Sequence, residues 1–109
     1  MQDARPVIDA LSALAQEHRL ALFRLLVQAG EKGLAAGAIA EAIDVPASSL
    51  SFHLSLMERT GIIVRTRVGR SLLYSANYPA MNLLVGYLTE NCCGGERDCV
   101  NVPDCEVAA

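Results

Sequence analysis

The chain has 109 residues, of which 52% are hydrophobic and 5% aromatic, and its formal net charge is −3 at pH 7. This length predicts one small domain with a thin core, which a second copy of the chain would help to cover. There is no run of eighteen apolar residues, and the start, MQDARPV, is too polar for a secretory signal. We therefore expect a cytoplasmic protein without a membrane span.

The charges are unevenly distributed. Residues 1–58 carry four basic and seven acidic side chains, whereas residues 59–89 carry no acid and four arginines: Arg59, Arg65, Arg67 and Arg70. A local arginine cluster in an acidic protein suggests contact with a specific polyanion, and the alternative is a merely solvated basic hairpin.

The first half of the chain predicts three helices. Apolar residues recur at helical spacing from Val7 to Ala15 and from Glu17 to Ala29, where Gly30 ends the pattern. Residues 31–33 are expected to form a turn, and a short alanine-rich helix follows from about Ala35 to Ile43.

Pro46 begins a fourth helix that ends at Gly61. Leu50, Leu54 and Met57 form its apolar stripe, and its other sides carry mostly small hydroxyl-bearing residues. A short helix, a turn and a helix with a small polar face are typical of a helix-turn-helix, because bulky side chains would hinder entry into the major groove.

Beyond this helix the pattern becomes strand-like, with two β-rich runs at 62–68 and 71–77 around a turn at Gly69 and Arg70. They predict a hairpin, or wing, whose arginines can reach phosphate groups. A last helix from Pro79 to Asn91 carries an apolar face for a partner subunit, formed by Met81, Leu84, Val85 and Leu88.

The predicted fold is mainly α with a β-hairpin: a dimeric winged helix-turn-helix of order α-α-α-α-β-β-α. It occupies residues 1–91, and residues 92–109 form a cysteine-bearing tail. All the cysteines lie there, in NCCGGERDCVNVPDC, as Cys92, Cys93, Cys99 and Cys105. In a reducing cytoplasm such a cluster is more often metal-binding or redox-active than a disulfide framework.

Three segments, HRLALFRLL, VPASSLSFHLSLMERTGII and VGRSLLY, resemble the ArsR/SmtB winged-helix metalloregulators. The most specific part is S-x-x-x-H-L followed by Gly61 and a hairpin with G-R at its tip. The resemblance implies a homodimer, joined through its first and last helices, that represses its own operon. Such a protein binds double-stranded operator DNA and leaves it when a metal or metalloid ion binds.

The resemblance also implies a recognition helix from Ala47 to Arg59, whose DNA-facing positions are Ser48, Ser49, Ser51 and His53. The wing would add Arg65, Arg67 and Arg70 as phosphate contacts. Phe52 departs from the family, whose members often carry Arg or Gln there, so a contact is either missing or replaced by an apolar contact with a thymine methyl. An alternative for His53 is a hydrogen bond within its own domain, and His18 is expected to be structural.

Two ion sites of the family are absent, because residues 34–37 contain no thiol and residues 79–91 contain no His or Asp. The CC-x5-C spacing of Cys92, Cys93 and Cys99 resembles the arsenite-responsive branch, with Cys105 as an auxiliary thiol. As(III), or the related Sb(III), would be the inducer, since soft ions select thiolates and the arsenic lone pair favours three ligands. No organic cofactor is expected.

The expected function is a metalloid-responsive transcriptional repressor. Alternatives are a repressor that responds to zinc, cadmium or redox state, a structural zinc site, and a thiol-based protein that sequesters metalloid without regulating DNA. The basic hairpin and serine-bearing helix argue against sequestration. An enzyme is not expected, because the sequence offers no nucleophile with a plausible base, no phosphate-cradling loop and no paired acids.

Overall fold

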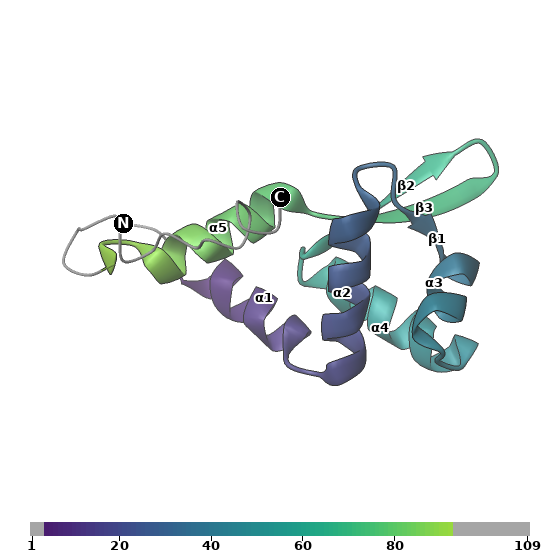
Figure 1. Cartoon of the computed structure of the whole chain (residues 1–109), viewed down its shortest axis with the longest axis horizontal. Coiled ribbons are helices and arrows are strands. Elements are labelled where there is room, and N and C mark those ends of the chain that lie inside the picture. The colour runs from purple at the N-terminus through teal and green to yellow at the C-terminus, as the bar shows by residue number, and fades with distance from the viewer. Residues whose placement is uncertain (1–3, 93–109) are drawn as a thin grey trace, which may run out of the picture.

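The computed structural model describes residues 4–92. These residues form five helices and three strands (Figure 1), in the order α1 (Arg5–Leu14), α2 (Glu17–Ala29), β1 (Leu34–Ala35), α3 (Ala36–Ile43), α4 (Ala47–Arg59), β2 (Ile63–Val68), β3 (Ser71–Ala76) and α5 (Tyr78–Thr89). The predicted winged helix-turn-helix architecture is confirmed. The last helix ends two residues earlier than predicted.

The helix boundaries follow local chemistry. Gln16 precedes α2, and its side chain accepts a hydrogen bond from the backbone nitrogen of Arg19 at 2.9 Å. Gly30 follows α2 with a φ of 92°, a backbone conformation that favours glycine. Asn77 caps α5 by accepting a hydrogen bond from the Ala80 nitrogen at 3.2 Å. Gln16 and Asn77 thus satisfy backbone N–H groups that the first turns of α2 and α5 leave without intrahelical partners.

The wing belongs to a three-stranded antiparallel sheet of order β1-β3-β2. Strands β2 and β3 pair from Ile63 with Ala76 to Val68 with Ser71, so the predicted hairpin is confirmed. Strand β1 was not predicted. It pairs Leu34 with Tyr74, just after a glycine that must approach β3 closely.

That glycine is Gly33, which has a φ of 78° and would place any Cβ against the Tyr74 carbonyl oxygen. The predicted turn at residues 31–33 therefore leads into a strand. A two-residue strand has no measurable sequence period, which is why periodicity missed it.

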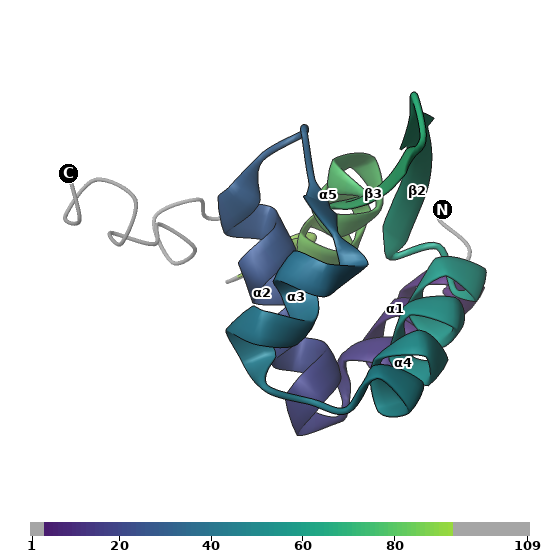
Figure 2. The ribbon, with the colours of Figure 1, turned by 90° about the vertical axis from the view of Figure 1, so that its right-hand side faces the viewer.

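The core is formed by residues of all five helices together with the start of β2 and the end of β3, and Figure 2 shows how α1, α2, α3 and α4 are arranged. Six large side chains are fully buried there: Leu22, Leu26, Ile39, Met57, Ile62 and Ile63. Their packing fixes which side of α4 faces inward.

Helices α1 and α5 lie side by side at the end of the molecule opposite the wing (Figure 1). Helix α1 buries Val7, Ala10 and Ala13, and α5 buries Leu84. Val85 and Leu88 of α5 stay exposed, so the predicted apolar face of this helix is divided between the core and the surface. Across residues 4–92, no helix is long and apolar enough to span a membrane.

Candidate nucleic-acid interface

Helix α4 has a buried side and an outward side. Leu50, His53, Leu54 and Met57 are buried. The opposite side presents four exposed residues spaced at i, i+4, i+7 and i+11, which share one face of a helix: Ser48, Phe52, Ser55 and Arg59. We call these four the outward row.

The outward row contains one of the predicted DNA-facing residues, Ser48. Ser55 was not predicted to contact DNA, Arg59 entered only as part of the arginine cluster, and Phe52 was expected either to lack a contact or to meet a thymine methyl. A signal for them was present in the sequence, because the stripe of Leu50, Leu54 and Met57 sets the opposite face of the helix.

The two other predicted serines lie beside the outward row. Ser49 is half-buried, and Ser51 is exposed. Ser51 lines a groove of about 260 Å³ between α3 and α4, together with Ser55, Glu58 and Arg65. Ser51 is thus directed more toward α3 than Ser48 is.

His53 does not occupy the DNA-facing surface that the resemblance implied. Only 7% of the residue is exposed. The Arg19 guanidinium lies within hydrogen-bonding distance, 3.5 Å from His53 Nδ1. Arg19 is itself held by donating from Nε to the Ala13 carbonyl oxygen at 2.7 Å. The structure thus agrees with the alternative for His53, a hydrogen bond within its own domain, because its position follows the buried stripe of α4.

The surroundings of His53 lower the pKa of its imidazole. Burial is the largest cause, followed by the positive charge of Arg19 and then by His18. The His18 and His53 rings lie 5.9 Å apart. The neutral imidazole that results can accept a hydrogen bond from Arg19.

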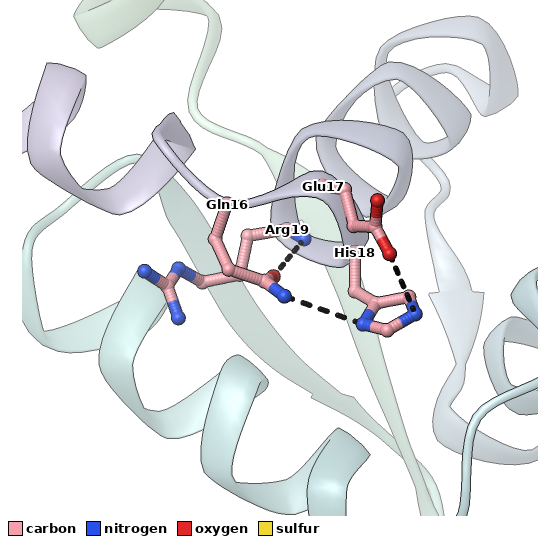
Figure 3. A network of polar contacts seen from close by, with 4 residues as sticks. All are labelled: Gln16, Glu17, His18 and Arg19. Atoms are coloured by element: carbon pink, nitrogen blue, oxygen red, sulfur yellow. Dashed lines mark hydrogen bonds and ion pairs between the residues drawn. The ribbon is translucent and has the colours of Figure 1, made fainter.

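The start of α2 is held by a small polar network (Figure 3). The Gln16 amide nitrogen lies 3.3 Å from His18 Nδ1, and His18 Nε2 lies 3.9 Å from a Glu17 carboxylate oxygen. His18 therefore belongs to the capping network of α2, in keeping with the structural role predicted for it.

The predicted wing arginines differ in their surroundings. Arg65 Nε lies 3.4 Å from a Glu58 carboxylate oxygen, which ties the base of the wing to the end of α4. Arg67 and Arg70 are exposed, and no acidic side chain of residues 4–92 forms an ion pair with either of them. Arg67 and Arg70 are therefore the wing charges most available to phosphate.

The cysteines follow the last helix. Cys92 is half-buried and lies three residues beyond the end of α5. Cys93, Cys99 and Cys105 lie outside the described residues. Within residues 4–92, no three His, Cys, Asp or Glu side chains are grouped so that they could hold a metal ion.

Sequence comparison matches part of the chain to a known domain family. Residues 14–66 match a family model described as a helix-turn-helix domain. The chain is 36% identical over 74 residues to the HTH-type transcriptional regulator NmtR of Mycobacterium tuberculosis. The matched region covers 68% of this chain and 59% of the length of NmtR.

Two solved structures have the same fold. An ArsR-like transcriptional regulator from Rhodococcus sp. RHA1 has a TM-score of 0.72 at 20% identity, with 92% of each chain covered. A homodimeric winged helix-turn-helix DNA-binding domain from Mycobacterium bovis has a TM-score of 0.63 at 24% identity, covering 89% of this chain and 94% of that one. Fold and sequence matches together show a chain with a helix-turn-helix domain and a winged helix-turn-helix fold, similar to those of ArsR-like transcriptional regulators.

Proposed function

We propose that the protein is a metalloid-responsive repressor that binds operator DNA as a homodimer. Release would follow when As(III) or Sb(III) binds Cys92, Cys93 and Cys99. The observation that carries this proposal is the position of Cys92 three residues after α5, a helix whose exposed apolar residues a partner could cover.

The dimer interface would be formed by α1 and α5. These adjacent helices leave four large apolar residues between 42% and 61% exposed: Ile8, Leu11, Val85 and Leu88. Exposed apolar residues that gather on one surface mark interaction sites. A second copy is the natural occupant, since the similar Mycobacterium bovis domain is homodimeric.

DNA contact would use the outward row of α4 and the wing. A recognition helix of this type enters the major groove, and a dimer spaces two such helices for two half-sites. The acid-free arginine cluster of residues 59–89 supplies the phosphate contacts. The net charge of −3 disfavours general adhesion to DNA, so binding depends on this local placement.

The ion would bind next to the proposed dimer helices, where it could change how the two subunits are arranged. Three thiolates suit a soft, three-coordinate ion, and thiols with a pKa of about 8.5 must lose protons to bind it. Helix α5 contacts α1, which in turn contacts α4. An ion held after α5 could therefore change the spacing of the recognition helices, and a coupling of about 1–3 kcal/mol weakens operator binding about 5- to 150-fold.

Fluorescence anisotropy of the DNA fragment upstream of its own gene tests this proposal. We expect As(III) and Sb(III), but not Zn(II) or Cd(II), to release the protein. Cys92→Ser, Cys93→Ser and Cys99→Ser should bind DNA but no longer respond to As(III), whereas the matched control Cys105→Ser should respond nearly normally.

Other outcomes of this titration identify the alternatives. Normal release of Cys99→Ser by As(III) would contradict a three-thiolate site and favour a two-cysteine site at Cys92 and Cys93. Release by Zn(II) or Cd(II) alone would assign a different inducer. Binding of As(III) without any specific DNA binding would support metalloid sequestration.

A further inference from the structure

Phe52 is the exposed aromatic residue at the centre of the outward row. It is 60% exposed and lies between Ser48 and Ser55 on the outer face of α4. The other exposed large apolar side chains of residues 4–92 lie elsewhere, on α1, α2, α5 and the wing. Phe52 therefore lies away from the proposed dimer interface. Covering an exposed aromatic ring with a partner is favourable, because it removes apolar surface from water.

The ring of Phe52 has a defined support. It meets the His53 ring edge-on, with centroids 5.8 Å apart and an interplanar angle of 63°. His53 is buried and lies beside Arg19, so this support is part of the domain interior. A ring that is already supported loses less conformational freedom on binding than a free side chain does.

Because its neighbours on the outward row are short or charged, Phe52 is the apolar side chain of this row that would extend into the DNA major groove. Ser48 and Ser55 are short, and Arg59 places a positive charge on the same face. In the major groove, the apolar feature that distinguishes one base pair from the others is the C5-methyl group of thymine. Phenylalanine cannot donate or accept a hydrogen bond at a base edge, so this methyl group is its matching contact.

We infer that Phe52 reads a thymine methyl group in each half-site of the operator. This inference rests on the proposed DNA-binding function and deepens it, because it names the base chemistry that one residue of α4 selects.

Thymine-to-deoxyuridine substitution in the operator tests this directly, since it removes the methyl group and leaves every hydrogen-bonding group in place. With the wild-type protein, we expect substitution of the contacted thymine in one half-site to weaken binding about fourfold. A fourfold change corresponds to ~0.8 kcal/mol, the value of one buried methylene. Phe52→Ala should bind thymine and deoxyuridine duplexes equally, whereas Phe52→Leu should keep part of the preference.

Ser55→Ala is the matched control on the same face, and it should keep the full preference for thymine. Equal binding of the wild-type protein to thymine and deoxyuridine at every position would overturn the inference, even if the operator is still preferred over random DNA. A persisting preference in Phe52→Ala would overturn it as well. Failure of the wild-type protein to distinguish the operator from random DNA would instead contradict the proposed function, and the inference with it.

Discussion

Among single residues, His53 shows how burial argues against an assignment that came from a resemblance. It lies within the recognition helix, yet its ring faces Arg19 and the domain interior. Its lowered pKa means that the folded protein favours the neutral ring more than the unfolded chain does. This residue therefore links the stability of the domain to pH.

We predict that the free energy of unfolding falls as pH decreases through about 6.5, the pKa of an unperturbed histidine. Below that value the unfolded chain binds a proton that the folded protein resists, so stability is complete above the unfolded pKa and declines toward the lower folded pKa. Urea denaturation at a series of pH values measures this. His53→Gln should reduce the slope in that interval, and an unchanged slope would assign the titration to another group.

The wing arginines differ from one another in their ion pairing. Arg65 already pairs with Glu58, whereas Arg67 and Arg70 have no such partner among the described acidic residues. The three therefore cannot contribute equally to phosphate contact.

We predict that Arg67→Ala lowers the slope of log K against log salt by about one, and that Arg65→Ala lowers it less. The reason is that the Glu58 carboxylate partly neutralises Arg65 before DNA binds. Glu58→Gln should accordingly tighten DNA binding at low salt. Anisotropy titrations between about 50 and 200 mM salt provide the measurement, and equal slopes for the wild-type protein and Arg67→Ala would remove the wing from the interface.

Among the elements, the junction between β3 and α5 connects α5 to the end of α4. Asn77 caps α5, and its Nδ2 donates to the Gly61 carbonyl oxygen just after α4 at 2.7 Å. Tyr78 Oη donates to the Val27 carbonyl oxygen of α2 at 3.0 Å. These bonds hold the start of α5 against two other helices of the domain.

Asn77→Ala should lower the free energy of unfolding by about 1–3 kcal/mol, because it loses both a helix cap and a side-chain hydrogen bond. Asn77→Asp keeps the capping oxygen but lacks the donor to Gly61, so it should lose less. Chemical denaturation compares the two. Equal losses in both variants would show that the cap adds nothing beyond the bond to Gly61.

For the whole molecule, the exposed apolar residues of α1 and α5 predict its assembly. Leu88 is 61% exposed on α5, and Val68 is similarly exposed, at 57%, near the wing tip. Helix α5 and the tip of the hairpin formed by β2 and β3 lie at opposite ends of the molecule (Figure 1). They therefore offer a matched pair of substitutions for testing the interface.

We predict that Leu88→Glu shifts the protein toward monomers, because two charges would be placed in an apolar interface. Val68→Glu should leave the dimer intact. Sedimentation velocity over a range of protein concentrations measures the shift. Dimers of unchanged stability in Leu88→Glu would place the interface elsewhere.

Periodicity was sufficient to predict most of the fold. The bounds of α2 and α4 follow from apolar spacing together with Gly30, Pro46 and Gly61, and the hairpin follows from the change to a strand-like pattern. These features are local, because helical and strand repeats are written into neighbouring residues. The resemblance added the DNA-facing positions of α4 and the arsenite-responsive cysteine site, and both stay predictions.

Features that depend on contacts between distant segments required the folded chain. The pairing of β1 with β3 joins residues 40 positions apart, Leu34 and Tyr74. His53 lies within hydrogen-bonding distance of Arg19 of α2, and Arg65 of the wing pairs with Glu58 of α4. The exposure of Phe52 follows already from the apolar stripe of α4, and the structure adds its edge-on contact with the His53 ring. A sequence pattern indicates which local conformation each segment favours. Tertiary packing determines which of these conformations, and which contacts between distant residues, occur together in the folded protein.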